Sequence, residues 1–349
     1  MILFLTLAVG LWVLGHHLRT PKRARWIMIG LLYVLVLILL VVLPETHALR
    51  RSLGESFAEW GALGVLALVI MGYRAVLGRV RSRADVVERI ATPASKSGSF
   101  QADELDRYAR HIMLREIGGP GQKRLKAAKV LVVGAGGLGS PALMYLAAAG
   151  VGTIGVVDDD IVESTNLQRQ IAHTDDRIGM PKVFSAERAM KSVNPYVEVR
   201  PYHRRLTPEI ARDLIADYDL VLDGTDNFDT RYLVNDACVA LGKPLISGAL
   251  TQWEGQISLF DPAHGAPCYA CVFPQAPADG LAPSCAEAGV LGPLPGVVGA
   301  MMAVEAVKVI VDAGQGLAGR MLIYDALYAE TRVISLERRV DCATCGLSS

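Results

Sequence analysis

The fold is decided by the stretch KVLVVGAGGLGS, residues 129–140, in which a Val-rich run leads directly into a glycine turn. A helical pattern follows from Leu138 to Ala149, and a second strand-like run from Ile154 to Val157 ends in acidic residues. The order strand, turn, helix and strand predicts a β-α-β unit with parallel strands.

Further strand-like and helix-like stretches alternate after this unit. The strand-like runs are 197–199, 220–222 and 245–247, and the helix-like stretches are 183–192, 208–215 and 230–240. After Thr251 strand-like runs follow one another, which predicts an antiparallel side of the sheet, and a glycine-rich helix over 296–311 should cover a face. We therefore expect an α/β fold with a Rossmann-like, mainly parallel sheet and an antiparallel extension.

Composition points to a chain that contacts lipid. At about 150 residues per domain, the 349 residues predict about two folded units, or one large unit with an appendage. Hydrophobic residues make up 52%, charged residues 20%, and the mean hydropathy is +0.33, which excludes a disordered chain. The 35 basic residues balance 35 acidic ones, so no net field favours nucleic acid, and we expect no nucleic-acid partner.

The apolar residues concentrate near the N-terminus. Residues 26–43 are eighteen positions without a charge, which is a bilayer-spanning length, and shorter apolar runs cover 1–14 and 60–73. We expect a membrane segment over 1–80, with helices at about 1–18, 26–43 and 60–78. The start of the chain lacks the basic region of a cleaved signal peptide. The alternative is an apolar helical hairpin that packs on a partner protein.

Basic residues flank these runs on one side of the expected membrane. They are Arg19, Lys22, Arg23 and Arg25 before the second run, and Arg79, Arg81 and Arg83 after the third. The positive-inside rule places both groups in the cytoplasm. We expect a multi-pass protein of the cell (inner) membrane, with a linker at 81–102 and a cytoplasmic domain at 103–349.

The glycine turn has the pattern G-x-G-x-x-G over residues 134–139, between a strand and a helix. Its backbone N–H groups and the helix N-terminus form an anion site. Asp158, near the end of the next strand, is placed to bind a ribose hydroxyl. The same features fit an NAD-dependent oxidoreductase, and the glycines also have a purely structural explanation in close helix–strand packing.

Three charged residues come from successive loops at the same edge of the sheet: Arg169, Lys182 and Asp226. Transfer of an adenylyl group from ATP requires such a set, because charge gathers on the α-phosphate and leaving pyrophosphate needs cations and a metal held by a carboxylate. Each has a simpler explanation alone: Arg169 on a solvated face, Lys182 as a charge at a helix start, and Asp226 as an N-cap.

Four of the six cysteines form two Cys-x-x-Cys pairs, Cys268 with Cys271 and Cys342 with Cys345. Two closely spaced thiolate pairs suit a closed tetrahedral zinc site, so we expect a structural Zn²⁺. Cys238 lies in a helical stretch and is expected to be a small core residue.

Several short motifs together resemble the ThiF/MoeB/HesA family, whose adenylyltransferases are related to ubiquitin-activating enzymes. The motifs are RYARH (107–111), GAGGLGS (134–140), NLQRQ (166–170), Pro181-Lys182, Thr225-Asp226-Asn227, Gly255-Gln256 and the paired Cys-x-x-Cys. The resemblance runs in order from about Asp103 to Gly346 and leaves the first hundred residues outside it.

The resemblance implies an enzyme that activates a ubiquitin-like sulfur-carrier protein ending in Gly-Gly. The carrier's terminal carboxylate would attack the α-phosphate of ATP, in molybdopterin or thiamine biosynthesis. The implied nucleotide residues are Gly134, Gly136, Gly137, Asp158, Thr165, Asn166, Arg169, Lys182, Asp226 and Asn227, with Asp226 also holding Mg²⁺. Arg110 matches an arginine that the family inserts into the neighbouring subunit's site, which implies a homodimer.

Cys285, in a Gly/Pro/Ala-rich loop, matches a family position that forms a thioester or a persulfide-derived link with the carrier. Such a role requires an accessible thiolate. Only four residues follow Cys345, so we expect no rhodanese domain and a separate sulfur donor, either a cysteine desulfurase or a rhodanese. A catalytically silent membrane scaffold of the same fold is a further alternative.

Overall fold

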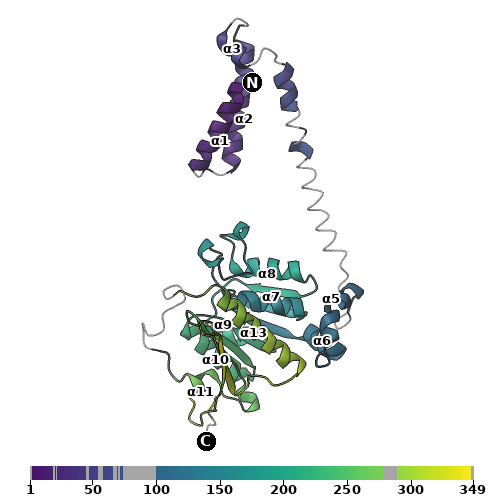
Figure 1. Cartoon of the computed structure of the whole chain (residues 1–349), viewed down its shortest axis with the longest axis vertical. Helices are drawn as coiled ribbons and strands as arrows, with labels where there is room; N and C mark the ends of the chain where they lie inside the picture. The colour runs from purple at the N-terminus through teal and green to yellow at the C-terminus, as the bar shows by residue number, and fades with distance from the viewer. Residues whose placement is uncertain are drawn as a thin grey trace. The chain divides into compact units, whose positions relative to one another are not determined.

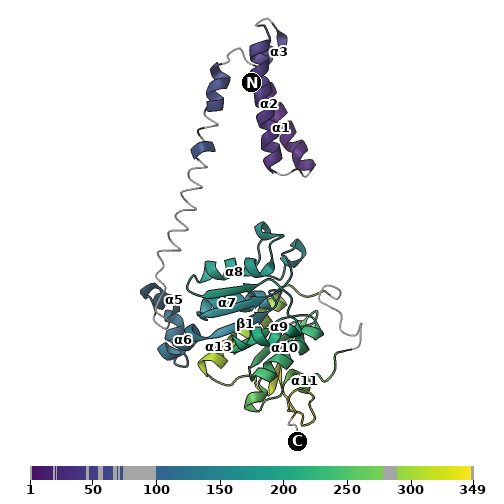
Figure 2. The same cartoon turned by 180° about the vertical axis from the view of Figure 1, so that it is seen from behind.

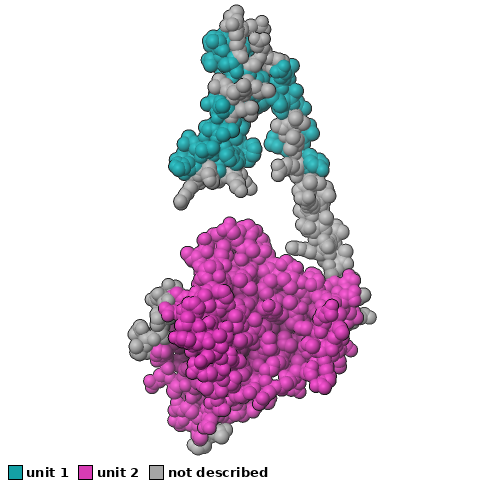
Figure 3. Space-filling view, viewed as in Figure 1, with its two compact units in different colours: residues 1–94 teal, residues 95–349 magenta. Residues whose placement is uncertain are grey.

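The computed structural model shows two compact units, Met1–Ala94 and Ser95–Ser349 (Figure 3). It describes residues 2–18, 20, 22–44, 47–53, 58–65, 69, 71–73, 100–277 and 289–346. Residues 81–99 of the expected linker and Cys285 lie outside the described residues.

The first unit is built from apolar helices. They are α1 (Ile2–His17), α2 (Lys22–Val42) and the short α3 (Ala48–Leu53). The turn between α1 and α2 is fixed by Thr20, whose hydroxyl donates to the carbonyl of Gly15 at 3.0 Å, while Arg25 Nε donates to the Thr20 carbonyl at 3.0 Å. The expected third helix is described only in part, with helical residues at 58–65, 69 and 71–73.

Within the described residues of the second unit, eight strands form one sheet in the order β3-β2-β1-β4-β5-β6-β7-β8. The strands are β1 (Lys129–Val133), β2 (Thr153–Val157), β3 (Glu198–Tyr202), β4 (Leu220–Asp223), β5 (Leu245–Leu250), β6 (Glu254–Phe260), β7 (Arg320–Asp325) and β8 (Glu330–Ser335). Neighbours from β3 to β5 pair parallel, and those from β5 to β8 pair antiparallel, which confirms the expected mixed sheet.

Helices cover both faces of the parallel half (Figures 1 and 2). On one face α7 packs with α8 and α13, and on the other α9 packs with α10. The helices of this unit are α5 (Ala102–Ile112), α6 (Gly118–Ala127), α7 (Gly139–Ala149), α8 (Lys182–Val193), α9 (Pro208–Ala216), α10 (Phe228–Leu241), α11 (Tyr269–Val272) and α13 (Pro293–Val311), with 3₁₀ turns η1 (Ser164–Asn166), η2 (Asp175–Arg177) and η3 (Pro262–His264). Because both faces are covered, β2 and β4 are buried at every position.

Two described helices are long and apolar enough to cross a membrane, and they differ in their surroundings. The segment Ala24–Val42 of α2 has a mean hydropathy of 2.7, and 11% of its most apolar window is buried. In α13 the mean hydropathy is 1.8, and 50% of the corresponding window is buried. Since α13 packs on α7 and on the sheet, it is an interior helix of the second unit.

The sheet has a topological switch point at β1, which lies between β2 and β4. In such sheets ligands bind beyond the carboxyl ends of the strands at this point. The chain leaving β1 is anchored there, because the N–H of Gly134 donates to the carbonyl of Val157 at 2.9 Å and that of Gly224 to Val133 at 3.0 Å. The loops after β1, β2 and β4, called here the strand-end site, therefore meet.

Candidate active site

The glycine turn, residues 134–139, has the shape of an anion site. Gly134 has a φ of +92°, and a Cβ on Gly139 would lie 1.8 Å from the Gly134 carbonyl oxygen, so α7 begins in contact with the turn. Within the described part of the chain, the N–H groups of Gly136 and Gly137 donate to no protein acceptor. They remain available to a phosphate at the start of α7.

Asp158 shapes this turn from the end of β2. One carboxylate oxygen accepts the N–H of Ala135 at 2.7 Å, and the other accepts the N–H of Asp160 at 2.8 Å. Burial raises the pKa of the Asp158 carboxyl above its usual value. A carboxylate has about four lone-pair sites, so both oxygens keep capacity for a ribose hydroxyl.

Arg169 lies beside the glycine turn. A Cβ on Gly137 would come within 3.8 Å of its Cγ, and its guanidinium donates to Asn166 Oδ1 and to the Thr165 carbonyl, each at 3.3 Å. The side chain is half-buried rather than on a solvated face. The structure thus gathers Arg169, Asn166 and the Thr165 backbone next to the turn.

Lys182 is buried at the start of α8, directly after Pro181. Its Nζ lies 2.7 Å from Oδ2 of Asp160, an acidic residue whose role the motif pattern did not reveal. A buried ammonium needs such a partner. The cation is therefore held at the carboxyl end of β2, in the same loop system as Asp158.

Asp226 and Asn227 follow β4 and differ in their bonding. Asn227 is the N-cap of α10, and its Oδ1 accepts the N–H of Thr230 at 2.9 Å. Asp226 is exposed, and in the described residues its carboxylate makes no hydrogen bond or ion pair. The explanation of Asp226 as an N-cap is therefore wrong, and its carboxylate is available for a ligand.

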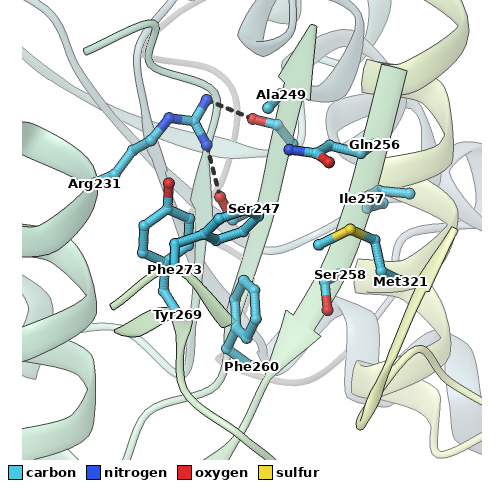
Figure 4. Close-up of a pocket in the computed structure, with 11 residues that line it drawn as sticks. Arg231, Ser247, Ala249, Gln256, Ile257, Ser258, Phe260, Tyr269, Phe273 and Met321 are labelled. Carbon is cyan, nitrogen blue, oxygen red and sulfur yellow. Dashed lines mark hydrogen bonds between the residues drawn. The ribbon is translucent and has the colours of Figure 1, made fainter. Parts of the chain in front are cut away.

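A buried network beneath this loop was not predicted. Asp223 Oδ1 accepts from the N–H and the hydroxyl of Thr225 at 3.0 and 2.7 Å, and its Oδ2 lies 3.8 Å from the Arg231 guanidinium. Arg231 also donates to Ser247 Oγ at 3.0 Å and to the Gly248 carbonyl at 2.7 Å (Figure 4). It donates to the Thr225 carbonyl as well. The network fixes the loop that carries Asp226, and a small pocket beside it is lined by Tyr269, among others.

Two further residues of the segment after Arg169 were missed. Gln170 is buried beside Gly136, and its Oε1 has no hydrogen-bond partner in the described structure. His173 is buried with its Nε2 2.9 Å from the Ala135 carbonyl. Gln170 is the last residue of the NLQRQ motif, and the one signal for His173 in the sequence was its position three residues past that motif.

The cysteine cluster, Cys268, Cys271, Cys342 and Cys345, is buried, with its first two residues at α11 and its last two in the C-terminal segment. All four sulfurs lie within 4.8 Å of one another, with nearest distances of 3.8 Å for 268–271, 3.6 Å for 268–342 and 3.4 Å for 271–345. A tetrahedral zinc with Zn–S bonds of about 2.3 Å separates its ligands by about 3.8 Å. The donor set and its spacing fit zinc, which would cross-link the C-terminal segment to α11.

The model of the ThiF family matches residues 108–344. The chain belongs to the ThiF family. A sulfur carrier protein adenylyltransferase of Thermus thermophilus is 52% identical over 248 residues, covering 70% of this chain and 92% of the relative. A SAMP-activating enzyme E1 of Haloferax volcanii is 48% identical, covering 71% and 91%. The crystal structure of E. coli MccB shares the fold, with a TM-score of 0.62 at 24% identity over 69% of this chain and 74% of MccB.

The ThiF match leaves two expected site residues without a structural assignment. Arg110 is exposed on α5, and its guanidinium has no partner in the described part of the molecule. Cys285 lies in the segment 278–288, outside the described residues. The apolar helices α1 and α2 precede the matched ThiF region, and the membrane assignment stays a prediction.

Proposed function

We propose that this ThiF-family chain adenylylates the C-terminal glycine of a ubiquitin-like sulfur-carrier protein. The supporting observation is that two backbone N–H groups at the start of α7, those of Gly136 and Gly137, make no hydrogen bond in the described residues and lie next to Arg169. Relatives at 52% and 48% identity carry names for this activation, so neither an NAD-dependent oxidoreductase nor a silent scaffold is favoured.

The reaction joins a carrier carboxylate oxygen to the α-phosphorus of ATP and breaks the bond from that phosphorus to the bridging oxygen. The products are an acyl-adenylate and pyrophosphate. The glycine-turn N–H groups bind phosphate oxygens, while Arg169 and Lys182 offset the charge that develops on them. Asp158 would bind the ribose, and Asp226, as an unpaired carboxylate, would hold Mg²⁺, which would supply positive charge against that of the phosphates.

The remaining roles extend this proposal. Arg110 reaches the site of a second copy in a homodimer, and Cys285 forms the covalent link that precedes sulfur transfer. A separate cysteine desulfurase or rhodanese supplies the sulfur, and the carrier belongs to molybdopterin or thiamine biosynthesis. Zinc at the cysteine cluster supplies stability and no step of the chemistry.

Pyrophosphate exchange into ATP tests the reaction. The full chain in detergent should catalyse exchange with a sulfur carrier ending in Gly-Gly, and not with the carrier lacking its last glycine. Asp226→Ala and Arg169→Ala should each lower exchange by at least about a hundredfold. Asp229→Ala, an exposed carboxylate in the first turn of α10, is the matched control and should leave exchange unchanged. Exchange that survives both site variants would contradict the assignment.

We further propose that α1 and α2 anchor the enzyme in the cell (inner) membrane, as parts of a multi-pass segment. The α2 surface supports this, because a row of large apolar side chains is exposed to the surroundings: Trp26, Ile27, Leu31, Val34, Leu35, Ile38, Val41 and Val42. Burying such a row in lipid is favourable, at about 25 cal/mol per Å². The basic residues that precede the apolar part of α2, which are Arg19, Lys22, Arg23 and Arg25, orient the catalytic domain toward the cytoplasm.

Topology reporters test the anchor. A C-terminal green fluorescent protein fusion should fluoresce in the membrane fraction after carbonate extraction, while an alkaline phosphatase fusion at the same position should be inactive. Recovery of the fluorescent fusion in the soluble fraction after extraction would instead support an apolar hairpin bound to a partner protein.

A further inference from the structure

Hydrogen bonds hold both backbone polar groups of Ala135 in the glycine turn. Its N–H donates to Asp158 at 2.7 Å, and its carbonyl lies 2.9 Å from His173 Nε2 and 3.3 Å from Ser140 Oγ. The next two residues carry the unpaired N–H groups of the turn. Because the Ala135 carbonyl and the Gly136 N–H belong to the same planar peptide group, fixing that carbonyl sets the direction of the Gly136 N–H and of the turn that continues into Gly137.

The hydrogen bonds define the state of the imidazole. A carbonyl oxygen only accepts, so His173 Nε2 carries a hydrogen, and Nδ1 faces Ser185 Oγ at 3.0 Å, where a neutral ring accepts the hydroxyl hydrogen. Burial lowers the pKa of the His173 imidazole, and the Lys182 and Arg177 cations lower it further. The ring is neutral near pH 7.

His173 also links the turn to α8. Ser185 lies one helical turn after Lys182, so the two residues share a face of α8. Ser185 is buried, and its carbonyl accepts from Arg177 at 2.9 Å. Hydrogen bonds thus connect Ser185 to His173 and His173 to Ala135, and α8 carries both Ser185 and Lys182, the proposed phosphate-binding cation.

We propose that His173 is a positioning residue of the nucleotide site: its Nε2–H holds the Ala135 carbonyl and so aims the Gly136 and Gly137 N–H groups at the ATP phosphates. The inference rests on the proposed function. His173 does not act as an acid or a base, because its ring is only 5% exposed and both nitrogens are engaged behind the turn. Preorganised donors of this kind are effective only when a supporting residue fixes their direction.

Two amide substitutions test the roles of the two ring nitrogens of His173 separately. In His173→Gln the side-chain amide nitrogen replaces Nε2 and keeps a donor to Ala135, whereas in His173→Asn it replaces Nδ1 and loses that donor. Titration calorimetry of the full chain in detergent with Mg-ATP should show a dissociation constant about tenfold weaker for His173→Asn and less than about threefold weaker for His173→Gln. Ser185→Ala, which frees the ring to turn, should fall between them.

A buried residue away from the turn controls for general destabilisation. Asn194 donates to Tyr108 and to the Ala147 carbonyl, each at 2.7 Å, near the C-terminal end of α7, whereas the glycine turn lies at its N-terminal end. Asn194→Ala should lower the unfolding temperature and leave Mg-ATP affinity unchanged. Equal losses of affinity in both His173 variants, or an equal loss in Asn194→Ala, would refute the positioning role. If the unaltered chain binds no Mg-ATP, the proposed function itself fails, and this inference fails with it.

Discussion

The strand-end site and the cysteine cluster use their polar groups in opposite ways. At the strand-end site, the N–H groups of Gly136 and Gly137 and the carboxylate of Asp226 find no partner in the described residues. In the cysteine cluster the four sulfurs are buried and face one another. Donors and acceptors without a protein partner can bind a ligand. Groups that are buried against one another instead stabilise the fold.

The same contrast distinguishes two layers within the strand-end site, the groups without a protein partner and the buried groups beneath them. Directly beneath the exposed groups lie Asp223, Arg231 and His173, which are buried and fully engaged with neighbours. Substitutions in this supporting layer should reduce stability, as those in the cysteine cluster should, and at His173 they should also weaken nucleotide binding. Substitutions of the unpaired groups should reduce activity alone.

Loss of the metal should have the largest effect. Structural zinc contributes on the order of 10 kcal/mol in small domains at neutral pH. We expect Cys268→Ser to lower zinc content from one equivalent and to lower the free energy of unfolding by several kcal/mol, as followed by atomic absorption and thermal denaturation. The control is Cys238→Ala, which alters a buried core thiol outside the cluster and should keep zinc. Full zinc content in Cys268→Ser would show that the cluster is not the metal site.

Breaking the buried ion pair should come next. Arg231→Met leaves the Asp223 carboxylate, which is 1% exposed, without its cation, and such a loss costs about 3–5 kcal/mol. Chemical denaturation of the variant measures this. Arg332→Met removes an exposed pair with Glu330 at 3.8 Å and should change stability by less than about 0.5 kcal/mol. Similar values for the two variants would contradict the distinction between buried support and exposed surface.

Sequence patterns were sufficient for the mixed sheet and for the cysteine cluster. The Val-rich strands and helical stretches between Lys129 and Ser247 form the expected parallel half, because their periodicity reflects burial on two faces. The glycine turn, Arg169 and the paired cysteines are recognisable because each has a fixed spacing that its chemistry requires.

The supporting layer was not predictable, because it depends on contacts between distant segments. Arg231 lies on α10 and contacts Asp223 at the end of β4 and Ser247 on β5. Nothing in its local sequence distinguishes it from a surface arginine. Asn227 rather than Asp226 caps α10, a choice that depends on where the loop leaves β4. Both residues are acceptable N-caps, so sequence alone could not decide between them.

The buried imidazole should make stability depend on pH. An unfolded histidine has a pKa of about 6.5, and the pKa of His173 in the folded chain is lower, mainly because the ring is buried, with Lys182 and Arg177 adding repulsion and Asp158 opposing it. At a pH between these two pKa values, the unfolded chain binds more protons than the folded chain. The free energy of unfolding therefore falls as the pH drops below about 6.5. His173→Gln should reduce this fall by at most about 1.4 kcal/mol per pH unit. Identical pH profiles of unfolding would show that His173 does not titrate in this way.

The smallest stability effect should distinguish two adjacent residues. Asn227→Ala removes the side chain that caps α10 and should cost about 1 kcal/mol, while Asp226→Ala removes no protein contact and should change stability by less than about 0.5 kcal/mol. Pyrophosphate exchange should show the larger loss in Asp226→Ala, because only that variant removes the proposed Mg²⁺ ligand. A loss of stability in Asp226→Ala equal to that in Asn227→Ala would mean that Asp226 belongs to the supporting layer, and the division between ligand-binding and supporting groups would not hold at this loop.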